Sequence, residues 1–93
     1  MRSYACIDRI EGQYAVCEVE LVTIEESLQL DCSEKETVML DVALEDIFYE
    51  LEDVRESDIL VVEHDGENVT SICGKDNHEK QRRIENLAAI MGE

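Results

Sequence analysis

The chain has 93 residues, a length typical of a single domain. Its 24 acidic and 8 basic residues give a formal net charge of −16 at pH 7, which excludes general electrostatic binding to phosphate backbones and anionic membranes. Hydrophobic residues make up 44%, which predicts one modest core. The sequence shows neither a transmembrane-length apolar run nor the apolar stretch of a signal peptide. We therefore expect a single cytoplasmic domain, residues 1–93.

The beginning of the chain predicts a β-hairpin with strands at 4–10 and 14–23. The second segment alternates apolar with acidic side chains in its middle, as in a half-buried antiparallel strand. Glycine at the intervening turn readily adopts positive φ. If the turn is Glu11-Gly12, Cys6 faces Cys17, whereas a turn one residue longer places Cys6 opposite Glu18 and prevents a disulfide. The sequence leaves this register open.

The middle of the chain predicts less regular structure. Residues 24–36 suggest exposed turns around a short strand near Leu28–Leu30. Residues 37–42 predict a strand with alternating faces. Residues 44–51 carry apolar side chains at helical spacing, which predicts one or two helical turns.

The last third predicts a second hairpin followed by a helix. Strands at 59–63 and 68–72 flank an Asp-Gly turn, and Gly74 ends the second of them. A helix over about 77–91 is favoured by an Asp or Asn at its N-cap. Its apolar stripe consists of Ile84, Leu87, Ala88 and Met91.

Together these elements predict a mainly β fold with one C-terminal helix. We expect a small five-stranded antiparallel barrel or rolled sheet, similar in size to an SH3 or OB domain, with a short helical turn in the middle. The final helix is expected to cover one face of the sheet or to close one end. The cysteines form no Cys-x-x-Cys pair, and we expect them as free thiols: Cys6, Cys17, Cys32 and Cys73.

Three strings in chain order resemble a known family. They are Ile7-Asp8-Arg9-Ile10-Glu11-Gly12 with Tyr14-Ala15-Val16, then Val54-x-Glu56-Ser57-Asp58-Ile59-Leu60, then Arg82-Arg83-Ile84 with Leu87. Over nearly the whole chain this order resembles the small prokaryotic family catalogued as domain of unknown function 3006. The resemblance implies a small intracellular β-domain of bacteria and some archaea, joined in some members to a hydrolase domain of the metallo-β-lactamase type. It implies no activity, cofactor or catalytic residue.

The chain departs from that family's pattern in its middle. It has extra residues around 22–36 and lacks the Leu-Pro that is common near the position of Leu44-Glu45. It is also more acidic than the resemblance implies. These departures leave the segment after the second strand as the least determined part of the predicted fold.

No residue pattern predicts a catalytic, cofactor or metal site. Zinc sites usually include a closely spaced Cys or His pair, whereas Cys73, His64 and His78 are badly spaced. The loop at 65–68 is too short for a calcium site. We therefore expect no cofactor, with His64 in a turn and His78 in the exposed first turn of the final helix.

Two groups of residues are candidates for contacts with a partner. The first surrounds the first turn, and the second lies on the final helix: Asp8, Arg9, Glu11 and Gly12, and Arg82 and Arg83. An arginine can present its guanidinium to a ligand carboxylate. With 24 acids in the chain, pairing of these arginines with the chain's own carboxylates is favoured instead.

The sequence favours a non-enzymatic protein-interaction or accessory module. Its partner is expected to offer a basic surface to a sheet edge or to the acidic face of this chain, with no direct contact to nucleic acid or membrane. Two alternatives stay open: an acidic nucleic-acid mimic or decoy, and a metal-dependent regulator or small enzyme. The sequence determines neither the partner nor the oligomeric state.

Overall fold

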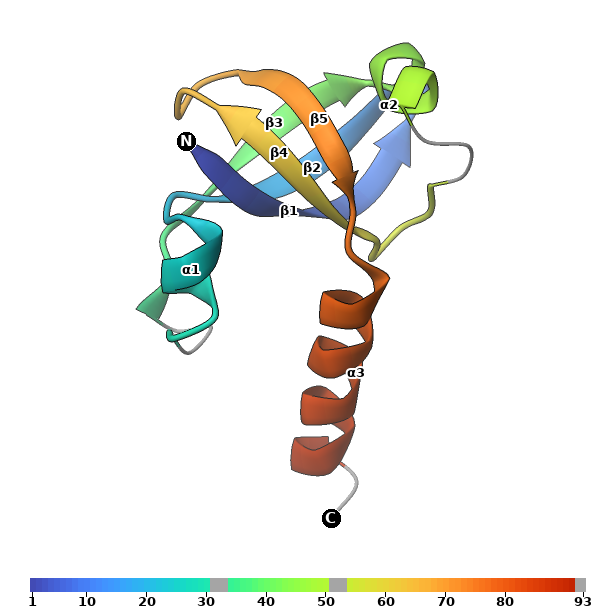
Figure 1. Ribbon diagram of the computed structural model, residues 1–93. Helices are drawn as coiled ribbons and strands as arrows, with labels where there is room; N and C mark the ends of the chain where they lie inside the picture. Colours follow the sequence, from blue (N-terminus) through green and yellow to red (C-terminus); the bar gives the residue numbers. More distant parts are fainter. Residues whose placement is uncertain (31–33, 51–53, 92–93) are drawn as a thin grey trace.

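The computed structural model describes residues 1–30, 34–50 and 54–91 and shows one five-stranded antiparallel sheet (Figure 1). The strand order is β3-β2-β1-β4-β5, so β3 and β5 form the two edges of an open sheet. The strands are β1 (Arg2–Glu11), β2 (Tyr14–Glu20), β3 (Thr37–Ala43), β4 (Ile59–His64) and β5 (Val69–Lys75). The helices are α1 (Ile24–Ser27), α2 (Leu44–Glu50) and α3 (Asn77–Met91). The mainly β prediction is confirmed, with an open sheet in place of a closed barrel.

The first hairpin has the register that prevents a disulfide. Glu11 pairs with Tyr14, so the turn is Gly12-Gln13, one residue later than Glu11-Gly12. Gly12 has a φ of 59°, a conformation that favours glycine. A bulge between Ile7 and Arg9 then shifts the register again, which places Cys6 opposite Glu18. Cys6, Cys17 and Cys73 are free thiols, and Cys32 lies outside the described residues.

The core lies on one face of the rolled sheet, as the alternation in the strands predicts. Helix α2 contacts both edge strands, and its Ile47 is fully buried in the core. This helix therefore covers the end of the sheet where β3 and β5 are left unpaired with each other. The core residues are Ala5, Ile7, Ala15, Cys17, Val19, Val42, Ile47, Val54, Leu60, Val62 and Ile72.

The segment after β2 begins with a short helix where an exposed turn was expected, and it contains no strand among its described residues. Strand β2 ends at Glu20, and the short helix α1 follows with Thr23 as its N-cap. The Thr23 hydroxyl accepts a hydrogen bond from the Glu26 backbone N–H at 3.3 Å, and the Glu26 carboxylate accepts from the Thr23 N–H at 3.4 Å. This reciprocal capping box satisfies backbone donors locally and favours helix. The predicted strand at Leu28–Leu30 is therefore wrong: turn and bend occupy those residues.

Strand β5 continues past Gly74, contrary to the sequence-based expectation. Gly74 pairs with Val61, and Ile72 pairs with the next residue, Val62. Cys73 is the extra residue of the resulting bulge. A bulge absorbs the glycine without ending the strand, and β5 runs to Lys75.

Helix α3 has the predicted bounds but not the predicted packing. Figure 1 shows it projecting away from the sheet instead of lying over one face. Ile84, the first residue of the predicted apolar stripe, is 48% exposed. The rest of the stripe has side chains outside what the structure describes. None of the described helices is long and apolar enough to cross a membrane.

Candidate functional site

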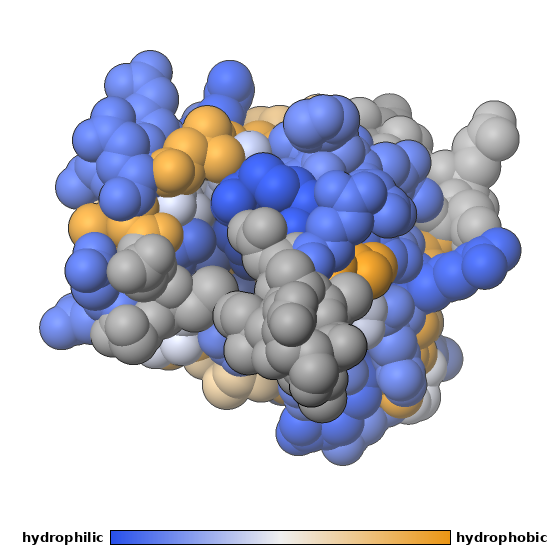
Figure 2. All heavy atoms as spheres, turned by 90° about the horizontal axis from the view of Figure 1, so that it is seen from below, coloured by the Kyte–Doolittle hydropathy of each residue, from blue (hydrophilic) through white to orange (hydrophobic). Residues whose placement is uncertain are grey.

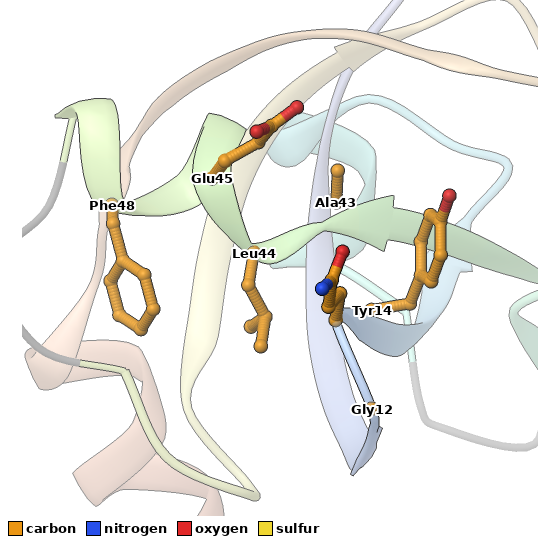
Figure 3. Close-up of a pocket in the computed structure, with 7 residues that line it drawn as sticks. Gly12, Tyr14, Ala43, Leu44, Glu45 and Phe48 are labelled. Atoms are coloured by element: carbon orange, nitrogen blue, oxygen red, sulfur yellow. The ribbon is translucent and has the colours of Figure 1, made fainter.

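A groove with two aromatic side chains in its walls lies beside the first turn. It has a volume of about 360 Å³ (Figure 3). Its walls come from the first turn, the start of β2, the end of β3 and the first two turns of α2: Gly12, Gln13, Tyr14, Ala43, Leu44, Glu45 and Phe48. The Leu44 N–H donates to the Gln13 carbonyl at 2.8 Å, which joins the start of α2 to the turn. We call this feature the turn–α2 groove.

Exposed aromatic rings flank the turn–α2 groove. Tyr14 is 53% exposed and Phe48 is 51% exposed, although the chain has only four aromatic residues. Figure 3 shows the side chains of Leu44 and Phe48 projecting in the same direction from α2. Single exposed apolar side chains are common, but aromatic side chains grouped in a hollow are typical of binding sites.

The rim of the turn–α2 groove is acidic. Glu45 lines it, and Asp46 follows in the exposed first turn of α2. Among the described ion pairs, none involves Glu45 or Asp46. Their charges are therefore available to a positively charged group outside the chain.

The residues predicted around the first turn pair mainly with one another. Arg9 Nη1 lies 2.7 Å from Asp8 Oδ2, and its Nε lies 2.6 Å from Glu11 Oε1. Hydrogen bonds to Glu11 and Asp8 raise the pKa of Arg9. This is the local pairing that the sequence favoured. Of the four predicted residues, only Gly12 lines the turn–α2 groove.

Arg82 and Arg83 lie in the first two turns of α3, which we call the root of the helix. They belong to a second charged region. Arg82 Nε lies 2.5 Å from Glu79 Oε1, and Arg83 Nε lies 3.0 Å from Glu79 Oε2. Arg83 also reaches Glu20 Oε2 at 3.0 Å and lies over the Tyr4 ring, 5.3 Å from its centroid. These arginines pair with the chain's own acids, as expected, and are not brought together with the first-turn residues.

Two buried carboxylates stabilise this root of α3. Burial raises the pKa of Glu79, but hydrogen bonds from Arg82 and Arg83 outweigh it and hold the pKa below its ordinary value. Burial likewise raises the pKa of Asp58, but the hydrogen bond from Lys80 and the Arg55 backbone N–H outweigh it and lower the pKa. Lys80 Nζ lies 2.6 Å from Asp58 Oδ1. We call these pairs, with Glu20, the α3 ion cluster.

Viewed along α3, the molecule is largely covered with hydrophilic residues (Figure 2). Hydrophobic residues appear there in small separate groups. A hollow of about 170 Å³ lies at the root of α3 and is lined by Cys6, Ser57, Ile59, Lys80, Arg83 and Ile84. The cations that line it already pair with Asp58, Glu20 and Glu79. The turn–α2 groove therefore remains the stronger candidate for binding.

His64 is a buried residue that the sequence-based prediction misplaced in a turn. It is the last residue of β4 and is 3% exposed. Gly66 N–H donates to its Nδ1 at 3.1 Å, so Nε2 carries the proton and donates to Ser3 Oγ at 2.9 Å. The Ser3 hydroxyl donates in turn to the Val22 carbonyl at 2.6 Å. The alternation Leu60, Val62, His64 is the signal that places this ring inside.

The histidines and cysteines do not assemble into a metal site within the described part of the chain. No group of three His, Cys, Asp or Glu residues there has the geometry to hold a metal ion. His78 is exposed in the first turn of α3, as expected, and lies apart from the buried His64. Cys73 is exposed on the edge strand β5.

Comparisons with models of protein families, with curated proteins and with solved structures found no match. The resemblance to the domain of unknown function 3006 therefore stays a prediction.

Proposed function

We propose that this chain is a non-enzymatic interaction module that binds a protein partner with a basic surface. The observation that carries the proposal is the way the chain uses its own charges. Seven of its eight Lys and Arg side chains form ion pairs with carboxylates of the same chain. Among the residues that the structure describes, those pairs use six acids, whereas the sequence has 24: Asp8, Glu11, Glu20, Asp58, Glu63 and Glu79.

The remaining cation, Arg55, also has an interaction within the structure. The positive charges thus stabilise the fold, while much of the negative charge faces solvent. A surface of this kind accelerates encounters with positively charged partners and repels negatively charged ones. The acidic first turn of α2, beside the turn–α2 groove, is the part of that surface where charge and shape coincide.

The free thiols support a cytoplasmic site of action as part of this proposal. Cys6, Cys17 and Cys73 are unpaired, and unpaired thiols are typical of reducing compartments. The resemblance to domain of unknown function 3006 is compatible with an accessory role, because some members of that family are joined to a hydrolase domain.

Affinity capture from a cell lysate at low and at physiological salt, followed by reconstitution with the purified partner, tests the proposal. We expect a stoichiometric partner whose affinity falls as salt rises, and falls further when Glu45→Gln removes one charge from the rim of the groove. Glu67→Gln, an exposed acid in the second turn, is the matched control. Salt-independent binding would contradict the proposal. A partner that releases this chain when DNA or RNA is added would favour the nucleic-acid mimic instead.

A further inference from the structure

We propose that the turn–α2 groove receives one hydrophobic side chain of the partner, from a segment in which Lys or Arg stands beside that side chain. This inference rests on the proposed function, since it names the contact site and the chemistry of the basic partner. It follows from the shape, the aromatic walls, the charge and the rigidity of the groove.

The size of the groove suits a side chain. Its volume of about 360 Å³ lies at the small end of the range of about 300–1,000 Å³ that is typical of ligand pockets. Phe48 and Leu44 supply apolar wall, and Tyr14 adds an aromatic ring with a polar hydroxyl. Phe48 is the chain's only phenylalanine, and half of it faces solvent. A partner side chain placed here would remove apolar surface from water.

The negative charge at the rim of the groove favours basic residues beside the partner's inserted side chain. Glu45 lies in the wall, and neither it nor Asp46 has a cation in the described ion pairs. The chain's Lys and Arg side chains are engaged elsewhere, chiefly in the α3 ion cluster and beside Asp8 and Glu63. A Lys or Arg next to the anchoring side chain therefore finds an unpaired carboxylate within the same site.

The same charge argues against a second copy of this chain as the occupant. Each copy carries a net charge of −16, so association brings like charges together. The cationic side chains of α3, which could offset this repulsion, already pair with Glu20, Asp58 and Glu79. The occupant is therefore a different, basic chain.

The groove is held in shape before any partner arrives. The Leu44 N–H donates to the Gln13 carbonyl, and Ala43 pairs with Tyr14 across β3 and β2. Ile47, on the opposite side of α2 from solvent, is fully buried in the core. A pre-formed site loses less conformational freedom on binding, which supports affinity for a short segment.

Titration of isotope-labelled protein with synthetic peptides, followed by NMR, tests the inference. The probes are a lysine-rich peptide with one central leucine, the same peptide with serine in place of leucine, and a leucine peptide with glutamate in place of lysine. We expect the first peptide alone to give saturable shifts centred on Tyr14, Leu44 and Phe48. Equal responses to the two lysine-rich peptides, or shifts away from the groove, would overturn it. So would shifts at the groove that depend on protein concentration without peptide, because they would assign the groove to a second copy.

Matched variants separate this inference from the proposed function. Phe48→Ala is expected to lower the affinity for the lysine-rich leucine peptide by about fivefold or more, the equivalent of about 1 kcal/mol. Leu28→Ala is the control, because it changes a side chain that is 53% exposed elsewhere on the surface. It is expected to leave the affinity for the peptide unchanged. If Phe48→Ala leaves the affinity for the leucine peptide unchanged while Glu45→Gln still weakens the binding of a basic partner, the groove inference fails. The proposal of an interaction module then stands. If neither variant has an effect on a captured partner, both fail.

Discussion

The two faces of the sheet are stabilised by different chemistry. On the core face, Ala5 and Ile7 of β1 pack with Leu60 and Val62 of β4 and are 1% exposed or less. The residues that alternate with them face the root of α3, where Tyr4 lies under Arg83. There, carboxylates as buried as the core itself form ion pairs beside the buried apolar residues Tyr4, Val16 and Ile59. A highly acidic chain can thus build one face without charge and use its few cations on the other.

This difference predicts different sensitivities. Apolar burial contributes about 1.5–3 kcal/mol for each large side chain and responds little to pH. Buried ion pairs offset a desolvation cost and become unfavourable when one partner is removed or neutralised. The core face should therefore respond most to changes of side-chain volume, and the α3 face to changes of charge.

Leu60→Ala should produce the largest loss of stability. Leu60 is fully buried, so the substitution leaves a cavity in the core and should lower the free energy of unfolding by about 2–5 kcal/mol. Urea denaturation followed by circular dichroism measures it. Met39→Ala, at a side chain that is 47% exposed, is the control and should cost much less. Equal losses for the two variants would contradict this assignment of the core.

Glu79→Gln should have the next largest effect. The substitution leaves Arg82 and Arg83 facing an uncharged group at a position that is 2% exposed. Because both arginines keep some access to water, we expect a loss of about 1–3 kcal/mol by urea denaturation, with faster amide exchange in the first turns of α3. Glu85→Gln, at an exposed position of the same helix, should leave both measurements unchanged. Unaltered exchange in Glu79→Gln would show that apolar packing, not charge, fixes the helix.

Acid should weaken the α3 face first. The pKa values of Glu79 and Asp58 are lowered in the folded state from ordinary values of 4.5 and 3.8. Their contribution to stability is therefore fully present above those ordinary values and is lost as pH falls through the lower folded-state values. Urea denaturation from about pH 7 to about pH 3 should show a smaller decrease below about pH 4.5 in Glu79→Gln than in the unaltered chain. If the free energy of unfolding falls equally with pH in the variant and in the unaltered chain, Glu79 makes no such contribution.

Tyr4 should give the smallest but most specific signal. Burial, followed by the charge of Asp76 and a 3.1 Å hydrogen bond to it, raises the pKa of Tyr4 from 10.0 to about 12. A raised pKa contributes stability that is fully present below pH 10 and is lost as pH rises through about 12. Ultraviolet absorbance should show one tyrosine that ionises near pH 12, and Tyr4→Phe should remove that transition. A transition that persists in Tyr4→Phe belongs to another ring.

The candidate site shows where prediction from sequence stopped. Gly12 was identified because a turn glycine carries a local signal, and it does line the turn–α2 groove. Tyr14 and Phe48 were not, because each is an ordinary apolar residue within its own segment and only the pairing of β2 with β3 brings them together. His64 was placed in the turn because it directly precedes the Asp-Gly signal, although its alternation with Leu60 and Val62 continues β4. Its hydrogen bond to Ser3, 61 positions away, is visible only in the tertiary structure.

The sequence by itself determined which segments form the five strands, where α3 lies along the chain and the excess of negative charge. These properties depend on local periodicity, turn residues and composition. Only the tertiary structure decided the hairpin register, the open edges of the sheet, the ionic attachment of α3 and the turn–α2 groove. The bulge in β1 sets the hairpin register, and the pair of Glu20 with Arg83 joins residues 63 positions apart; neither has a signal in the local pattern.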